Sequence, residues 1–292
     1  MSHLELAQNP NTNVDTLVNF SLFGDYYVRG AVAVNPSTPV NVLVSLSTDQ
    51  VYFVRQAVAR NPSTPSDILA KLSTDEDSVV RMYVAKNPNT PVDVLTQQFT
   101  NKEIIMNVNE MIVESRIGIA HNPNTPVDVL VTLSSDIDYD VRREVAQNPN
   151  TPVEILVRLA TDEDSWVRRA VACNPRTPSD ILAKLSTDEY SSVRGYVAQN
   201  PNTPVDVLVH LSTDGDWEVR RNVAENPNTP VNVLVKLSTD EDRDVRCGVA
   251  QNPNTPVDIL VKLSTDEDWK VWQYVAQNPN TPVDVLTRAL IH

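Results

Sequence analysis

The most regular charged feature of the chain is an arginine that returns at a fixed place in a repeating pattern. It is found at Arg29, Arg55, Arg81, Arg116, Arg142, Arg168, Arg194, Arg220 and Arg246. Such a ladder could bind nucleic-acid phosphates. Alternatively, the arginine position pairs with the aspartates found four residues earlier on the same face of a helix, which are Asp25, Asp77, Asp138, Asp164, Asp216, Asp242 and Asp268. We favour the ion pair, because both positions face inward on the expected helix, where a charge needs a partner.

Other residue types that carry chemistry do not form a recognisable site. Asp-x-Asp segments such as Asp214 to Asp216 lack the loop glycine and the distal glutamate of a calcium-binding loop, and they suit helix capping. The four histidines, His3, His121, His210 and His292, do not recur in register. The sequence therefore predicts no catalytic residue, no metal site and no cofactor, and it indicates that the protein is not an enzyme.

The two cysteines and the hydropathy of the chain bear on where the protein works. Cys173 and Cys247 lie three repeats apart, which places them beyond disulfide reach if neighbouring helices stack at ~8–10 Å. No apolar run approaches the length of a membrane span. We expect a reduced cytoplasmic protein with no membrane partner.

The pair Asn-Pro marks a repeat along the whole chain. It begins at residues 9, 35, 61, 87, 122, 148, 174, 200, 226, 252 and 278. Nine of the ten spacings are 26 residues, and the spacing from 87 to 122 is 35, which indicates an insertion of nine residues within about 96–115. The sequence predicts a single repeat array over residues 1–292.

Each repeat carries the signals of two helices. We number its positions from the asparagine of Asn-Pro. In the eighth repeat, Thr203 is expected to cap a first helix that starts at Pro204 and ends near Leu211. This helix is short enough to include 3₁₀ turns. Its apolar positions 5, 6, 8, 9, 10, 12 and 13 cover an arc of roughly 200°, which predicts a helix buried on most sides. A second helix should run from about Asp214 to Ala224 and end at the next Asn-Pro.

The face of the second helix that points away from the core varies most between repeats and carries aromatic and charged side chains. Because tyrosine, tryptophan and arginine dominate protein-binding hot spots, we predict that this face binds a protein or a peptide. The predicted binding residues are Tyr27, Tyr52, Phe53, Tyr83, Tyr139, Arg143, Trp166, Arg169, Tyr196, Trp217, Arg221, Trp269 and Tyr274.

The net charge of −14 argues against a nucleic-acid partner, since such proteins normally present a basic surface. Helix-start and ladder positions account for most of the acidic residues, so the charge does not by itself identify a basic partner. Two alternatives stay open: a nucleic-acid-binding helical-repeat protein, and a structural protein that self-assembles. A homo-oligomer could form through the chain ends or through the insertion.

The string NPxTPxxVLxxLSTDxDxxVRxxVA recurs over nearly the whole chain and resembles the leucine-rich repeat variant family of bacterial proteins, with features of the HEAT class of helical repeats. The resemblance implies an all-α fold, a right-handed α-solenoid whose repeats alternate an α-helix with a short 3₁₀-like helix. It also implies a scaffold that binds proteins. The best-known family member carries a cysteine-ligated iron–sulfur cluster, but this chain has no cysteine cluster, so that cofactor is not expected.

Overall fold

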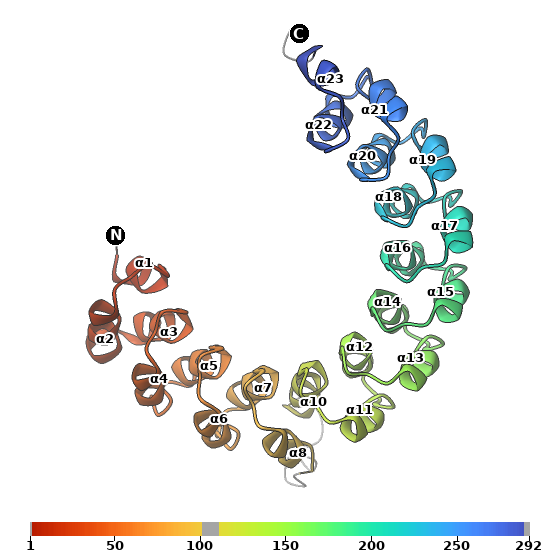
Figure 1. Cartoon of the computed structure of the whole chain (residues 1–292). Coiled ribbons are helices and arrows are strands. Elements are labelled where there is room, and N and C mark those ends of the chain that lie inside the picture. The colour runs from red at the N-terminus through yellow and green to blue at the C-terminus, as the bar shows by residue number, and fades with distance from the viewer. Residues whose placement is uncertain (1, 101–110, 289–292) are drawn as a thin grey trace. The chain divides into compact units, whose positions relative to one another are not determined.

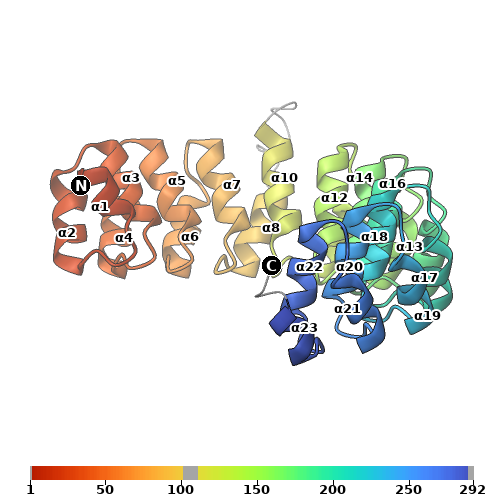
Figure 2. The same ribbon diagram turned by 90° about the horizontal axis from the view of Figure 1, so that it is seen from above.

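Helices are the regular elements of the structure, a computed structural model that describes residues 2–100 and 111–288. The chain divides into two compact units, Met1–Thr151 and Pro152–His292. The same pair of a first and a second helix repeats through both units (Figure 1, Figure 2). The prediction of an all-helical repeat solenoid is confirmed. That both units form one continuous array stays a prediction.

In unit 1, residues 1–151, the second helices other than α1 are longer than most first helices. The first helices are α2 (Val14–Phe23), α4 (Val40–Leu46), α6 (Ser66–Leu72), α8 (Val92–Thr100) and α11 (Val127–Leu133). The second helices are α1 (His3–Gln8), α3 (Tyr26–Val34), α5 (Tyr52–Arg60), α7 (Ser78–Lys86), α10 (Met111–His121) and α12 (Tyr139–Gln147).

Unit 2, residues 152–292, repeats the pattern, and most of its helices are seven or nine residues long. The first helices are α13 (Val153–Leu159), α15 (Ser179–Leu185), α17 (Val205–Leu211), α19 (Val231–Leu237), α21 (Val257–Leu263) and α23 (Val283–Arg288). The second helices are α14 (Ser165–Cys173), α16 (Ser191–Gln199), α18 (Trp217–Glu225), α20 (Arg243–Gln251) and α22 (Trp269–Gln277).

Within each unit the helices form two layers, one of first helices and one of second helices (Figure 1). Neighbouring second helices pack directly against one another, and each first helix rests on the second helices beside it. The core lies between the layers and recurs in every repeat. In the eighth repeat, α17 packs against α18, and Leu208, Leu211, Val219 and Val223 of these two helices are all buried.

The first helix is buried on one side only, so the prediction that most of its sides are covered is wrong. Val205 at position 6 and Val209 at position 10 are 53% and 43% exposed. The reason is the layering: a first helix packs on the second-helix layer, and among the described residues no further layer covers its other side.

The recurring Thr-Pro pair does not act as predicted at the start of the first helix. The N-cap is Pro204, and no described side chain caps α17. Thr203 is buried and donates its hydroxyl to the carbonyl of Val197, 2.5 Å away. It thus adds a second bond to a carbonyl in the last turn of the preceding second helix, α16, which already accepts the N–H of Asn200 at 3.1 Å.

The first turn of the first helix includes a 3₁₀ bond. In the second repeat, the backbone N–H groups of Val42 and Leu43 both donate to the carbonyl of Pro39, at 3.0 and 3.1 Å. The remainder of α4 is α-helical. The expected 3₁₀ character is therefore limited to the ends of a short α-helix.

The second helix begins three residues later than predicted. In the eighth repeat α18 starts at Trp217, and its N-cap is Asp216, whose carboxylate accepts the N–H of Glu218 at 2.9 Å. Capping explains the aspartate at position 17. It does not explain the aspartate at position 15, which has a different partner.

The asparagine of Asn-Pro joins three repeats, a role that the sequence analysis did not predict. The Asn226 side chain is buried, and its amide donates to the carbonyls of Ala198 and Asn200 at 2.6 and 3.2 Å. Its Oδ1 accepts the N–H of Asn228 at 2.9 Å. The same pair of donations recurs at Asn35, Asn61, Asn87, Asn122, Asn148, Asn200, Asn252 and Asn278. A buried ladder of amides therefore runs along each unit.

The insertion predicted within about 96–115 overlaps the end of α8 and the start of α10. Residues 101–110 lie outside the described part of the chain. The expectation that this segment could join two copies of the chain stays a prediction.

Candidate protein-binding face

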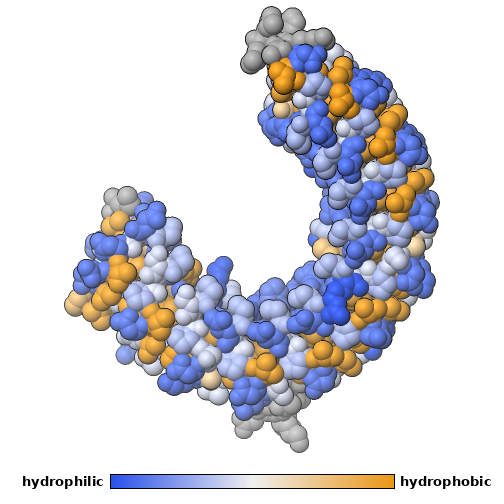
Figure 3. Space-filling model, viewed as in Figure 1, coloured by the Kyte–Doolittle hydropathy of each residue, from blue (hydrophilic) through white to orange (hydrophobic). Residues whose placement is uncertain are grey.

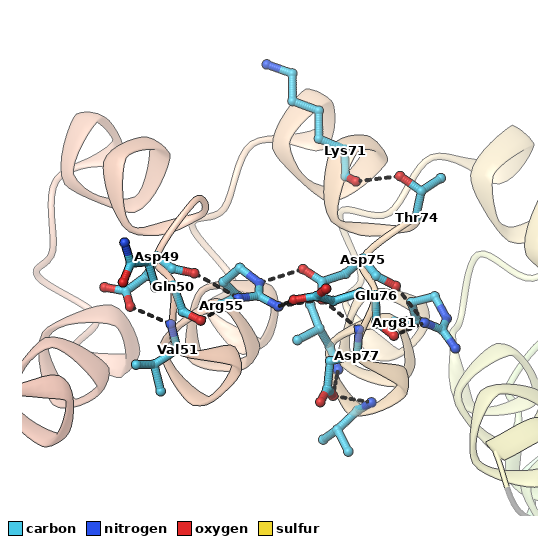
Figure 4. Close-up of polar contacts among 12 residues, drawn as sticks. Asp49, Gln50, Val51, Arg55, Lys71, Thr74, Asp75, Glu76, Asp77 and Arg81 are labelled. Atoms are coloured by element: carbon cyan, nitrogen blue, oxygen red, sulfur yellow. Dashed lines mark hydrogen bonds and ion pairs between the residues drawn. The ribbon is translucent and has the colours of Figure 1, made fainter.

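The arginine ladder fixes the loops from which the second helices start. Arg55 donates from Nε and Nη2 to the carboxylate of Asp75 at 2.7 and 2.9 Å, and from Nη1 to the carbonyl of Asp49 at 2.8 Å (Figure 4). One guanidinium thus ties the loop of its own repeat to the loop of the next. The same side-chain pair joins Arg29 to Asp49, Arg116 to Asp136, Arg168 to Asp188, Arg194 to Asp214, Arg220 to Asp240 and Arg246 to Asp266.

The predicted pairing with the aspartate four residues earlier is wrong, although the structural role of the arginine is confirmed. Asp77, four residues before Arg81, caps α7 by accepting the N–H groups of Val79 and Val80. A carboxylate that faces the N-terminus of its own helix cannot also face a side chain one turn further along. The arginine of the preceding repeat, Arg55, instead reaches a carboxylate twenty residues ahead.

Both members of a ladder pair stay charged. The hydrogen bonds to Asp75 raise the pKa of Arg55 above its ordinary value. Burial favours a higher pKa for the Asp75 carboxyl, but the hydrogen bonds from Arg55 and from the Asp77 N–H outweigh burial and hold that pKa low. The Arg55 and Asp75 side chains are only 10% and 7% exposed. Guanidinium groups held in this way are engaged inside the protein rather than presented to phosphates.

On the second-helix face of unit 1, aromatic side chains gather at α3 and α5. Tyr27, Tyr52 and Phe53 are about half exposed, and the rings of Tyr27 and Phe53 meet edge to face, 6.5 Å apart. Tyr27 and Phe53 border a largely apolar cavity of about 330 Å³ with Gly30 and Val34. Gly30 makes room for the ring, because a Cβ there would lie 2.6 Å from Phe53 Cε1.

The other predicted residues of unit 1 differ in accessibility. Tyr83 is half-buried and packs against the core, whereas Tyr139 is 41% exposed. Arg143 forms ion pairs with Asp140 and Glu144. Burial would raise the pKa of the Glu144 carboxyl, but hydrogen bonds with His121 and Arg143 outweigh it and hold that pKa below its ordinary value.

In unit 2, one arginine is held between two aromatic rings. The Arg169 guanidinium lies 4.6 Å from the ring centroid of Trp166, in its own helix α14, and 4.5 Å from that of Tyr196, in α16. It also donates to the Tyr196 hydroxyl at 3.2 Å. Trp166 is still 51% exposed. The stack joins three predicted residues into one rigid, partly exposed cluster.

Toward the end of unit 2 the face becomes more polar. Trp217 and Trp269 are 41% and 67% exposed, and Arg221 pairs with Glu225 at 2.7 Å. Arg221 and the half-buried Tyr274 border one polar cavity of about 160 Å³. Its lining residues are Arg221, Asp244, Cys247, Gln251, Lys270, Gln273 and Tyr274.

Two exposed tyrosines on the second-helix side were missing from the predicted set. Tyr190 replaces the usual capping aspartate before α16 and is 49% exposed, with Arg168 5.6 Å from its ring centroid. Tyr26 begins α3, and its ring lies 4.1 Å from that of Tyr27. The break in the capping pattern at Tyr190 was a readable signal in the sequence.

Within residues 2–100 and 111–288, no group of three or more His, Cys, Asp or Glu side chains could hold a metal ion. Over the same residues, none of the helices has both the length and the apolar character that a membrane crossing requires.

The similarity of the chain to a known protein family lies in its repeats. Five segments match the family described as leucine rich repeat variant: residues 52–77, 139–164, 192–216, 217–242 and 243–268. The chain carries repeats of the leucine-rich repeat variant family. A solved leucine-rich repeat variant with a repetitive structural motif is 26% identical, at a TM-score of 0.51. The match covers 78% of this chain and 87% of that one.

Two further solved structures resemble the chain more weakly. An engineered protein is 21% identical over 94% of this chain and 97% of its own, with a TM-score of 0.40. Importin beta is 13% identical over 99% of this chain and 42% of its own, with a TM-score of 0.33. No curated protein sequence matches the chain.

Proposed function

We propose that the chain is a non-catalytic scaffold that binds a protein or a peptide through the second-helix face. The observation that carries the proposal is the exposure of large aromatic side chains there. Tyr52, Tyr139, Trp166 and Trp269 are each at least 41% exposed, in repeats whose cores are already filled by valine, leucine and alanine. Aromatic side chains that the core does not need contribute most to binding energy when a partner covers them.

The repeat supports this function mechanically. The arginine and asparagine ladders hold each second helix against its neighbours, so the variable side chains stand on a rigid frame. A frame that is ordered before binding loses little conformational entropy when a partner binds. Each repeat can then add its own contacts, as in other repeat scaffolds.

The charged residues of the face favour a protein partner over a nucleic acid. Arg143, Arg221 and Arg243 form ion pairs with neighbouring carboxylates, and Arg169 is held in its aromatic stack. Phosphate binding would require these pairs to break. The two cysteines, which are free, suit a reducing compartment, and we place the function in the cytoplasm.

The experiment that tests the proposal is affinity capture from the native lysate followed by mass spectrometry. The full chain is compared with a variant in which Tyr139, Trp166, Trp217 and Trp269 are changed to Ala. A matched control changes Val40, Val44 and Val131 to Ala, because these residues are similarly exposed but lie on the first-helix layer of unit 1.

Specific proteins retained by the unchanged chain and the valine variant, but lost by the aromatic variant, would support the second-helix face as the binding surface. Circular dichroism must show equal helicity for all three proteins. Equal capture by the aromatic variant, or no specific capture by the unchanged chain, would contradict the proposal.

A further inference from the structure

The first-helix layer of unit 2 carries a regular stripe of exposed valines. Position 6 is Val205, Val231 and Val257 on α17, α19 and α21, with 49–53% exposure. Position 10 is Val209, Val235 and Val261 on the same helices, with 39–44% exposure. Orange, apolar patches along this layer are visible in Figure 3. Single exposed apolar residues are common on proteins, but a continuous stripe marks an interaction surface.

The charges beside the stripe are separated along the helix axis, with acidic residues in the first turn and basic residues in the last turn. Position 7, in the first turn, is acidic at Asp206 and Asp258, with Asn232 between them on α19, and position 11, in the last turn, is basic at Lys236 and Lys262, with His210 beside them on α17. The helix dipole favours this distribution. All four charged side chains are exposed, and no ion pair joins any of them to another part of the described chain.

A surface with an acidic edge, an apolar centre and a basic edge is complementary to itself. When two copies face each other through this layer, a two-fold axis can lie in the plane between them, perpendicular to the first helices. Rotation about that axis reverses the direction of the helices. It therefore places the acidic edge of one copy against the basic edge of the other, with the valines between them. Such an isologous contact is the commonest way in which identical chains pair.

The two charged edges continue beyond the valine stripe: on α15, Asp180 in the first turn and Lys184 in the last turn are exposed in the same order. From the valine stripe and its sorted charges, we propose that the first-helix layer of unit 2 binds a second copy of this chain, with first helices antiparallel. The surface lies on the layer opposite the proposed partner-binding face, so one chain has room for both contacts.

The test measures the mass of the full chain by sedimentation velocity over a series of concentrations. The unchanged chain is expected to form a dimer that weakens as salt rises, since its edge contacts are ionic. Two edge variants are made. The first, Lys236→Glu with Lys262→Glu, makes both edges acidic, and the second, Asp206→Lys with Asp258→Lys, makes both edges basic. Each alone should be monomeric, because like charges then face each other.

Mixing the two edge variants in equal amounts should restore a dimer, because the acidic face of one then meets the basic face of the other. A third variant, Val235→Ser and Val261→Ser, should lower the association constant by roughly tenfold or more, because apolar area no longer leaves water. These side chains lie on the exposed face of the last turns, so the core is not disturbed and helicity should stay unchanged.

Two results would overturn the proposal: an unchanged chain that is monomeric at every concentration, or a dimer that survives in both edge variants. The second result would point to another interface, such as the chain ends. A variant with Trp217→Ala and Trp269→Ala should remain dimeric, so failure of the proposed partner-binding face and failure of this interface give different results.

Discussion

Arg194 and Asp214, twenty residues apart, form a two-point ion pair between consecutive repeats of unit 2. Nε lies 2.6 Å from Oδ2 and Nη2 lies 2.9 Å from Oδ1. The third donor, Nη1, reaches the carbonyl of Asp188 in the preceding loop at 2.8 Å. Planar guanidinium and carboxylate groups match in this geometry, so the pair fixes both the distance and the orientation of two neighbouring loops.

Replacing Asp214 by Asn should destabilise the fold by about 1–3 kcal/mol, the usual cost of losing hydrogen bonds to a charged group. Arg194 would keep its backbone acceptor but lose its charged partner. Urea unfolding followed by circular dichroism measures the change. Asp67→Asn is the matched control, since Asp67 is exposed in the first turn of α6, and it should change stability by less than about 0.5 kcal/mol. Equal effects of both variants would show that the ladder does not stabilise the fold.

Stability should fall in acid. The pKa values of Asp49, Asp75, Asp214 and Asp240 are held below the ordinary aspartate value: burial acts to raise them, but bonds from the ladder arginines and the loop N–H groups prevail. A carboxyl with a depressed folded-state pKa contributes fully above its unfolded pKa of about 4 and loses that contribution as pH falls through the folded value. Urea midpoints should therefore be level from about pH 7 to about pH 5 and drop below about pH 4. A smaller drop is expected for Asp214→Asn, and an identical drop would argue against the ladder as the cause.

The helix content, the repeat boundaries and the structural role of the ladder arginines could be predicted from the sequence because each depends on local spacing. The prolines and the apolar period indicate where helices begin and end, and they do so without reference to tertiary contacts. A charge that recurs on an inward-facing position needs a partner, whichever residue supplies it. Local pattern is therefore enough for the elements and for the kind of interaction.

The partner of Arg194 shows that local spacing does not identify which carboxylate pairs with a ladder arginine. Four residues before this arginine the chain has Tyr190, so a helical ion pair with an aspartate at that position is not available to it. Its carboxylate is Asp214 of the next repeat. The tyrosine was a signal in the sequence against the intrahelical pair, but only the packing of consecutive repeats identifies the actual partner.

The candidate site was predictable in part for a similar reason. Periodicity placed Trp217 and Trp269 on the exposed face of the second helices, where they lie. It also placed Val205 and Val209 of the first helix in the core, where they do not lie, because apolar character alone does not say how many layers surround a helix. The stack of Arg169 depends on side-chain conformation across two repeats, which spacing does not determine.

Two glycines should respond to alanine in opposite directions. A Cβ at Gly118 in α10 would lie 2.9 Å from both the Ala85 Cβ and the Met82 carbonyl oxygen of α7, so Gly118→Ala should destabilise the fold by about 1–3 kcal/mol through overpacking. A Cβ at Gly215 meets nothing within 4 Å, and its φ is not positive. Gly215→Ala should therefore stabilise by about 0.4–1 kcal/mol by restricting the unfolded chain. Thermal melts of the two variants test the contrast, and a shift of the same sign in both would contradict it.

The buried asparagine ladder predicts a large difference between two asparagines of one loop. Asn226→Ala removes two donations to the carbonyls of Ala198 and Asn200 and one acceptance from the Asn228 N–H. Since each buried polar group left unpaired costs about 1–3 kcal/mol, the variant should lose at least about 2 kcal/mol. Asn228→Ala is the matched control, because that side chain is exposed and donates one bond, to the carbonyl of Pro201. Its expected loss is below about 1 kcal/mol in the same urea titration, and comparable losses would mean that the ladder carries little of the stability.

The two cysteines should differ in reactivity toward a thiol reagent. Cys173 is exposed, whereas Cys247 is buried, and burial together with Asp244, Asp268 and Asp266 raises the pKa of the Cys247 thiol to about 11. Because the thiolate is the reactive form, Cys247 should be almost inert at about pH 8. Ellman's reagent is expected to titrate one thiol rapidly in the folded chain and both in urea, and Cys173→Ser should abolish the rapid reaction. A rapid reaction that survives this substitution would show that the α20 helix opens far more readily than its packing against α18 and α22 indicates.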